Sequence, residues 1–145
     1  MRNLRLDKKI VLERIDIIQK SLERLKEFQS LSKGKFLLDK NFAAAEHYIR
    51  YGLEATFDIC AHILSRIPGA YVGEYKKMAE EMGRQEIIPQ KFAQSKLYQM
   101  AGYRNRLTHF YFGVGPKEMY GIIQNDLDDF KEFVKYIKPL LLDKK

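Results

Sequence analysis

The sequence predicts an all-α protein, an antiparallel bundle of four to five helices, and three observations support this. Apolar residues recur at steps of three or four along most of the chain. No stretch shows the apolar–polar alternation, bounded by turn residues, that indicates a strand. The four prolines and nine glycines fall mostly where helices could begin or end. Because the 145 residues contain no internal repeat and no low-complexity segment, we expect residues 1–145 to form a single domain.

The first two predicted helices are long, and each carries one apolar stripe. The first spans about 6–31, before residues 32–35 break the pattern. Its apolar positions are Val11, Ile15, Ile18, Leu22, Leu25 and Phe28. The second is capped by Asp39 or Asn41 and runs to Pro68. Its apolar positions are Phe42, Ala45, Ile49, Leu53, Phe57, Cys60, Leu64 and Ile67.

Three further helices are predicted in the second half of the chain. A short amphipathic helix covers 71–82 and ends at Gly83, and another begins at Pro89 and stops at residues 113–116. The last helix carries a stripe of Ile123, Leu127, Phe130, Val134, Ile137 and Leu141. A coiled coil would use similar stripes, but the long ones last only about three heptads, so bundle packing is favoured. The division of these apolar faces between a core and a dimer interface stays open.

The net charge of +7 favours polyanionic partners without identifying one. Residues 1–35 contain ten Lys/Arg and five Asp/Glu, which is typical of a solvated basic helix face. Residues 88–117 contain five basic residues and no acidic one. We interpret this second, acid-free stretch as functional.

Several classes of protein are disfavoured by composition. The single cysteine, Cys60, cannot form an internal disulfide, and no His/Cys cluster has zinc-ligand spacing. The first residues lack the continuous apolar core of a signal peptide, and no apolar run approaches the ~20 residues of a membrane-spanning helix. We therefore expect a cytoplasmic protein without a metal site and without a membrane segment.

A polar stripe follows another face of the second predicted helix at intervals of four residues. It consists of Glu46, Arg50, Glu54, Asp58 and His62. Oppositely charged neighbours at this spacing can pair, and such stripes are usually solvated. The alternative is that part of the stripe lines a functional cleft in which Asp58 and His62 meet a ligand together.

The segment from Arg104 to Tyr111, Arg-Asn-Arg-Leu-Thr-His-Phe-Tyr, is the candidate functional centre. At ~100° per residue, Arg104 and Tyr111 share one helical stripe, and Asn105 and His109 share an adjoining one. Arginine offers a planar charged fork that matches phosphate oxygens, and histidine exchanges protons near neutral pH. Asn105 could orient the imidazole or a phosphate. A surface cluster favoured by the helix dipole is the alternative.

These residues resemble those of a known family, the HEPN superfamily, whose ribonucleases carry an Arg-x4–6-His motif. The chain is most similar to the HepT-like branch with Arg-x4-His-x-Tyr, here Arg104, His109 and Tyr111. The resemblance covers roughly residues 39–137. It includes the segments EATFDICAHILSRI, GAYVGEYKKMAEEM and KLYQMAGYRNRLTHFYF.

The resemblance implies a metal-independent endoribonuclease that needs no cofactor and works as a homodimer, with the two motifs facing each other across a cleft. Arg104 would hold the phosphate, and His109 would handle protons as the RNA 2′-hydroxyl attacks. Asn105 and Arg106 would support them.

The resemblance further implies a toxin–antitoxin system. The partner would be a minimal nucleotidyltransferase of the MntA type that neutralises the toxin by transferring AMP to Tyr111. One alternative is a non-catalytic subunit that binds a nucleotide or substrate for a nucleotidyltransferase. A plainer one is a basic helical adaptor with no small-molecule chemistry.

Overall fold

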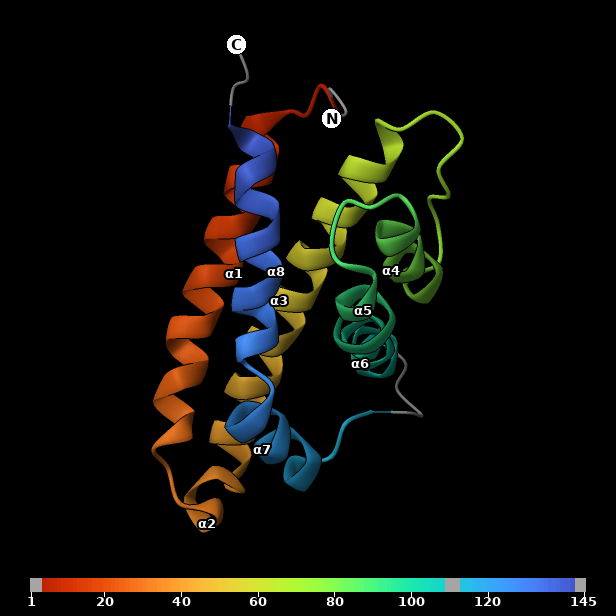
Figure 1. The fold of residues 1–145 in the computed structure, drawn as a ribbon. Helices are drawn as coiled ribbons and strands as arrows, with labels where there is room; N and C mark the ends of the chain where they lie inside the picture. Colours follow the sequence, from red (N-terminus) through yellow and green to blue (C-terminus); the bar gives the residue numbers. More distant parts are fainter. Residues whose placement is uncertain (1–3, 109–112, 143–145) are drawn as a thin grey trace.

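The computed structural model describes residues 4–108 and 113–142, and this part of the chain is helical without any strand. Three elements form the centre of the bundle: α1 (Lys8–Gln29), α3 (Asp39–Ser65) and α8 (Asp128–Ile137). Figure 1 shows α1 antiparallel to both α3 and α8, while α4, α5 and α6 pack together on one side of α3. The predicted all-helical bundle is therefore confirmed. None of the helices in the described part is long and apolar enough to cross a membrane.

Helix α1 has the stripe that the sequence predicts. Asp7 caps its start, where Oδ1 accepts a hydrogen bond of 3.3 Å from the Ile10 amide. Five of the six predicted apolar positions are buried, and Phe28 is partly buried. Burial of a side chain of this size stabilises the fold by roughly 1.5–3 kcal/mol, so the stripe holds α1 against α3.

The connection from α1 to α3 contains a short helix that the sequence did not predict. Element α2 (Lys33–Phe36) begins at Ser32, whose hydroxyl accepts from the Lys35 amide. Phe36 is fully buried and packs against the rings of Phe28 and Tyr120. The break at 32–35 is thus one turn of helix, stabilised by the burial of Phe36.

The predicted capping of α3 is wrong. Leu38 occupies the cap position, and no side chain caps the helix. Asp39 is instead the first helical residue, where its charge suits the positive end of the helix dipole. The Asn41 side chain donates a 2.8 Å hydrogen bond to the Lys35 carbonyl, so it ties α3 to α2. Within α3, buried Cys60 has a raised thiol pKa because burial disfavours the thiolate.

Helix α4 (Tyr75–Arg84) begins later than predicted, because residues 71–74 are a loop. The loop is held by Glu81, whose buried carboxylate accepts from the Tyr71 amide. Arg84 donates two hydrogen bonds of 2.7 and 2.6 Å to the same carboxylate, and Gln85 donates another. These bonds lower the pKa of Glu81 to about 2, against the opposing effect of burial. A sequence pattern cannot show that the loop amide has this partner.

The predicted final helix is two helices, α7 (Pro116–Asn125) and α8, followed by a 3-10 turn over Lys138–Leu141. The chain turns at Asp126 and Leu127, where the amides of Asp129 and Phe130 bond three residues back. The apolar period runs through this turn, because Ile123, Leu127 and Phe130 are all buried. Periodicity alone therefore could not reveal the division.

Helix α7 covers the far end of α1. Tyr120 donates to the Leu31 carbonyl, and the side chains of Gln29 and Gln124 bond to the main chain of the opposite element. The carbonyls of Gln29, at the end of α1, and of Leu31 are thereby satisfied. These contacts fix the middle and second half of α7 relative to α1, and α7 is the helix that follows the motif.

Candidate active site

The motif begins in the last turn of α6 (Tyr98–Thr108), which continues a helix that is not regular throughout. It is preceded by α5 (Gln90–Phe92) and by one π-helical turn over Ala93–Leu97. A π turn inserts one extra residue and rotates the helix that follows, and such turns often occur at functional sites. Buried Gly83 of α4 packs against it. The π turn thus helps to set the direction in which the motif side chains point.

Two of the predicted site residues, His109 and Tyr111, lie outside the described residues, in the segment 109–112. Their roles therefore stay predictions. The structure does describe Arg104, Asn105 and Arg106, which precede them on α6.

Arg104 lies between two partners from other helices. Its Nε is 3.2 Å from Oε1 of Glu54 on α3, and its guanidinium carbon lies 3.8 Å from the centre of the Tyr75 ring on α4. The Arg104 side chain is 19% exposed. The Nε is buried and donates no well-directed hydrogen bond within the described part of the chain. Arg104 is therefore held in place mainly by an ion pair and by stacking.

Arg106 has a different environment, although it is only two residues away. Its Nη1 and Nη2 each donate a 2.6 Å hydrogen bond to the carboxylate of Glu118, the third residue of α7. This pairing raises the pKa of Arg106 and lowers the pKa of Glu118. The bidentate pair connects the elements on either side of the segment 109–112. Its role here is to join α6 to α7.

The acid-free character of residues 88–117 does not extend to three dimensions. The carboxylates of Glu54 and Glu118 come from α3 and α7 and pair with Arg104 and Arg106. The absence of acidic residues from 88–117 therefore does not leave these two arginines without acidic partners. Sequence distance hid both partners.

Asn105 is half-buried, and its side chain forms no hydrogen bond with the rest of the described chain. Its carbonyl, like that of Arg104, accepts from the Thr108 hydroxyl, at 3.0 and 3.3 Å. Thr108 thus satisfies carbonyls at the end of α6. The Asn105 amide is left to interact with groups outside the described residues, which is compatible with the supporting role predicted for it.

Asp58 and His62 attach α1 to α3. Asp58 accepts a 2.9 Å hydrogen bond from Nε of Arg14, and His62 Nε2 accepts one of 2.9 Å from the Asp7 amide. Burial and nearby Arg66 lower the pKa of His62, which favours the neutral ring that can accept this bond. Both contacts are structural, so the structure gives no support to a ligand cleft formed by these two residues. Within the described residues, Glu54 of the polar stripe pairs with Arg104 of the motif.

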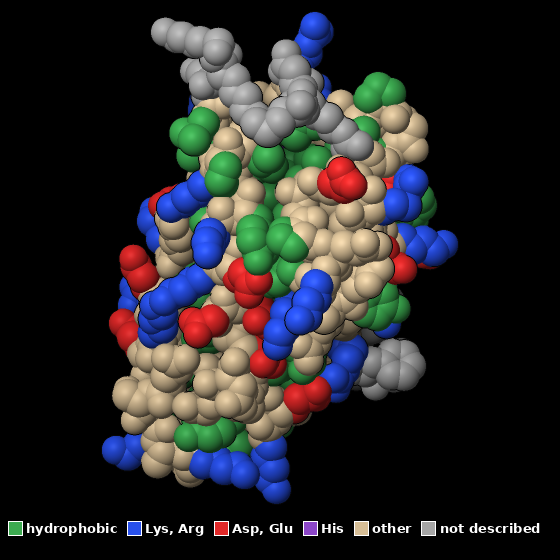
Figure 2. Space-filling model, viewed as in Figure 1, with side chains coloured by type: hydrophobic (Ala, Val, Ile, Leu, Met, Phe, Trp, Pro, Cys, Tyr) green, Lys and Arg blue, Asp and Glu red, His purple; other side chains and the backbone are tan. Residues whose placement is uncertain are grey.

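The surface of the bundle is not uniformly basic. Figure 2 shows Lys/Arg and Asp/Glu side chains interspersed over the face that it presents. Basic residues of the N-terminal stretch pair with carboxylates, as in Lys20–Asp16 and Arg24–Glu27. This agrees with the interpretation of residues 1–35 as a solvated face. Within the described part no group of three His, Cys, Asp or Glu could hold a metal ion.

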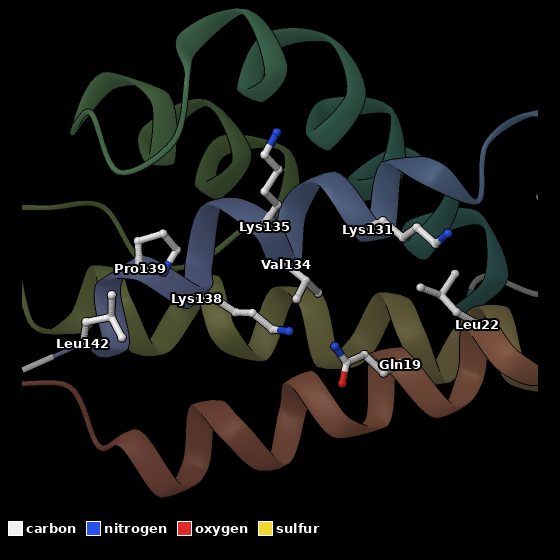
Figure 3. A pocket seen from close by; sticks show the side chains of 8 residues that line it. All are labelled: Gln19, Leu22, Lys131, Val134, Lys135, Lys138, Pro139 and Leu142. Atoms are coloured by element: carbon white, nitrogen blue, oxygen red, sulfur yellow. The ribbon is translucent and has the colours of Figure 1, made fainter.

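A groove of about 470 Å³ lies between α1 and α8, away from the motif. Figure 3 shows Leu22 on α1 and Val134 on α8 among its lining residues, while Lys135 points away from α1. Because its lysines do not converge on one point, the groove lacks the arrangement of an anion site. The motif at the end of α6 remains the candidate site.

Comparison with solved structures shows that this chain shares its helical-bundle fold with HEPN toxins. The tri-AMPylated HEPN toxin of Shewanella oneidensis, solved in complex with its MNT antitoxin, superposes with a TM-score of 0.77 at 21% identity, covering 90% of this chain and 97% of that one. A toxin–antitoxin complex solved with AMP-PNP gives a TM-score of 0.76 at 20% identity, covering 90% and 98%. At these identities the likeness concerns the fold.

The family is shown by sequence. The model of the family "Ribonuclease HepT-like" matches residues 18–137, so this chain belongs to the ribonuclease HepT-like family. A curated relative, the tRNA nuclease HepT of Aphanizomenon flos-aquae, is 25% identical over 134 residues, which are 92% of this chain and 90% of the relative. The match begins within α1, earlier than the region from residue 39 in which the resemblance was visible.

Sequence reasoning missed Glu54 and Tyr75 as neighbours of Arg104. Glu54 was visible as part of the polar stripe on α3, and Tyr75 stood in a segment that resembled the family. No spacing rule connects either residue to Arg104, because the three come from separate helices. Only the packing of α3, α4 and α6 brings them together.

Proposed function

We propose that this protein is an endoribonuclease toxin that cleaves RNA at the Arg104–His109 motif. Its membership of the ribonuclease HepT-like family supports a nuclease, and the relative named as a tRNA nuclease suggests tRNA as the substrate. The observation that carries the proposal is the state of Arg104: its guanidinium is held by Glu54 and Tyr75, and its terminal amino groups form no hydrogen bond with any described residue. Such a fork matches phosphate oxygens.

The proposed chemistry needs no bound metal. The RNA 2′-oxygen attacks the adjacent phosphorus and gives up its proton to His109, while Arg104 stabilises the negative charge that develops on the phosphate oxygens. The bond from phosphorus to the 5′-oxygen breaks, and that oxygen takes a proton from the protonated His109, which returns to its neutral form. The products are a 2′,3′-cyclic phosphate and a 5′-hydroxyl. DNA lacks the 2′-hydroxyl, so it is not a substrate.

The test is cleavage of a tRNA pool by the purified chain in the presence of EDTA. We expect the parent to cleave, Arg104→Ala to be slower by roughly 100- to 1000-fold, and His109→Ala by roughly 100- to 10,000-fold. Arg50→Ala removes an exposed arginine from α3 and serves as the control with parental activity. Both motif variants should retain the helical circular dichroism of the parent.

Two outcomes would overturn this proposal. Cleavage by Arg104→Ala at the parental rate would exclude the motif as the active site. A parent that binds nucleotide or RNA but leaves all RNA intact would instead favour the non-catalytic subunit that presents a substrate to a nucleotidyltransferase.

We further propose that the chain acts as a homodimer and that a nucleotidyltransferase antitoxin silences it by AMPylation of Tyr111. The support is the AMPylated toxin of Shewanella oneidensis and its MNT antitoxin, whose fold this chain shares. The tyrosine oxygen would attack the α-phosphorus of ATP, lose its proton and release pyrophosphate. Each AMP then places a phosphodiester anion near the motif, where it competes with substrate phosphate for Arg104.

Intact-mass measurement after co-expression with a minimal nucleotidyltransferase of the MntA type tests the modification. The parent should gain whole AMP units, and Tyr111→Phe should gain none at this position. Tyr51→Phe, which changes an exposed tyrosine on α3, is the matched control and should be modified like the parent. An unmodified parent, or a fully modified Tyr111→Phe, would remove Tyr111 from the mechanism.

A further inference from the structure

The guanidinium of Arg104 is oriented by two side chains that lie far from it in sequence. Glu54 of α3 approaches Nε at 3.2 Å, and the Tyr75 ring of α4 lies 3.8 Å from the guanidinium carbon. We propose that Glu54 and Tyr75 are positioning residues, which hold Arg104 so that its two terminal amino groups face the scissile phosphate. This inference rests on the proposed ribonuclease activity and assigns residues to it.

Tyr75 provides a rigid plane. Its ring packs edge-on against Phe57, with centroids 5.4 Å apart at 77°, and Phe57 is almost fully buried in α3. The guanidinium lies over the ring, where a cation is attracted by the negative face of the π system. Stacking restricts the guanidinium to rotation within one plane.

Glu54 fixes the remaining rotation. It stands on α3 between the buried residues Leu53 and Ala55, so its backbone is anchored in the core. Its carboxylate lies beside the buried Nε, while the Nη atoms form no hydrogen bond with the described part of the chain. Glu54 therefore pairs with the Nε side of the guanidinium, and the two terminal amino groups stay available for a phosphate.

Arg106 shows the opposite arrangement on the same helix. Both of its Nη atoms are already bonded to Glu118, at 2.6 Å each. A carboxylate at the terminal amino groups would compete with substrate phosphate, whereas a carboxylate at Nε does not. The position of Glu54 relative to Arg104 thus explains how an arginine can be neutralised and still bind an anion.

The first test compares Glu54→Gln with Glu46→Gln in the tRNA cleavage assay. Glu46 lies two turns before Glu54 on the same helix and pairs with no described residue, so its variant makes the same charge change without touching Arg104. We expect kcat of Glu54→Gln to fall about 10- to 100-fold, as is typical for partners that orient a functional group. KM should change less than threefold, and Glu54→Asp should recover part of the loss.

The second test concerns the stacking of Arg104 on Tyr75. Tyr75→Phe keeps the ring and should cleave like the parent, whereas Tyr75→Leu loses the cation–π contact and should lower kcat by roughly 2- to 30-fold. Equal activity of the leucine and phenylalanine variants would show that the ring does not position Arg104. Parental kcat in Glu54→Gln would overturn the role of Glu54.

A third measurement separates this inference from the proposed function. The Arg104 Nε–Hε signal in a ¹H–¹⁵N spectrum, assigned by its loss in Arg104→Lys, should shift and exchange faster with solvent in Glu54→Gln but not in Glu46→Gln. If the parent cleaves no RNA while this signal responds, the ribonuclease proposal fails and the positioning contact stands. If the signal is the same in Glu54→Gln and the parent, Glu54 does not hold Arg104 and the inference fails.

Discussion

Three arginines show that the partners of a side chain decide what it does. Arg84 and Arg106 each donate two short hydrogen bonds to one carboxylate, and these bonds hold neighbouring segments of the chain in place. Arg104 has its carboxylate at Nε and an aromatic ring below it. Of these three, Arg104 is the one suited to bind a phosphate.

The two histidines that the structure describes, His47 and His62, also differ in their partners. His62 accepts a hydrogen bond from the first capped turn of α1, whereas His47 is exposed and packs edge-on against Tyr48 and Tyr51. The assignment of proton transfer to His109 stays a prediction, because His109 lies outside the described residues.

His62 should make stability depend on pH. Its pKa in the folded state lies below the ordinary value of 6.5, mainly because of burial. A neutral ring is needed to accept from the Asp7 amide, so this stabilisation is present above pH 6.5 and is lost as the pH falls through the folded-state pKa. Between pH 7 and pH 5 the free energy of unfolding of the parent should fall by about 0.5–1.5 kcal/mol more than that of His62→Gln, whose oxygen accepts without titrating.

Urea unfolding at the two pH values measures this difference. His47→Gln is the matched control, because it removes an exposed histidine without a hydrogen bond in the described structure, and it should keep the slope of the parent. Identical pH slopes for His62→Gln and the parent would show that the His62 contact does not contribute.

At the scale of elements, the packing of α4 against the π turn positions the helix that carries the motif. Gly83 permits this close approach, since a Cβ there would lie 2.7 Å from the Cβ of Ala93 and 3.2 Å from the Cα of Gln90. Neither neighbour can move without shifting the backbone. We therefore expect Gly83→Ala to destabilise the protein by about 1–3 kcal/mol.

Gly121 offers the matched comparison. It lies inside α7 with nothing within 4 Å of an added Cβ, so Gly121→Ala should stabilise the protein by about 0.5–1 kcal/mol through helix propensity. Urea denaturation of both variants measures the two effects. A Gly83→Ala variant as stable as the parent would mean that α4 and the π turn separate at little cost.

The separation of α7 from α8 determines which helix meets α6 at the junction that follows the motif helix. The Arg106–Glu118 pair connects the two helices on either side of residues 109–112. A single long C-terminal helix, as the apolar stripe suggested, would not provide α7 as a separate element at this junction. The turn at Asp126 lets α7 cover the end of α1 while α8 fills the centre of the bundle.

For the whole molecule, the bundle serves to bring three helices together at one arginine. Glu54, Tyr75 and Arg104 come from α3, α4 and α6, and each helix is anchored by a buried apolar face. The fold is shared at a TM-score of 0.77 with a protein only 21% identical in sequence. Packing of this kind tolerates many apolar substitutions, so a shared fold alone does not assign a function. A function has to be assigned from the motif residues.

The net charge of +7 does not describe the surroundings of the motif arginines, because Arg104 and Arg106 both pair with acidic side chains. Three arginines pair with acidic side chains that are distant in sequence, Arg14 with Asp58, Arg104 with Glu54 and Arg106 with Glu118, and local sequence windows do not show these pairs. In the proposed function the substrate phosphate binds to Arg104, whose terminal amino groups form no hydrogen bond with a described residue. Net charge indicates a preference for polyanions, and the site decides where one binds.

The sequence alone determined the helical class, the two long helices with their stripes, and the motif whose spacing resembles the HepT-like branch. These features are local, because a helical period and a short motif are written within a few turns of the chain. The tertiary structure decided the loop before α4, the π turn, the division of the last helix, and the partners of Arg104 and Arg106. Each of these depends on contacts between residues from different elements, and no pattern within one segment contains that information.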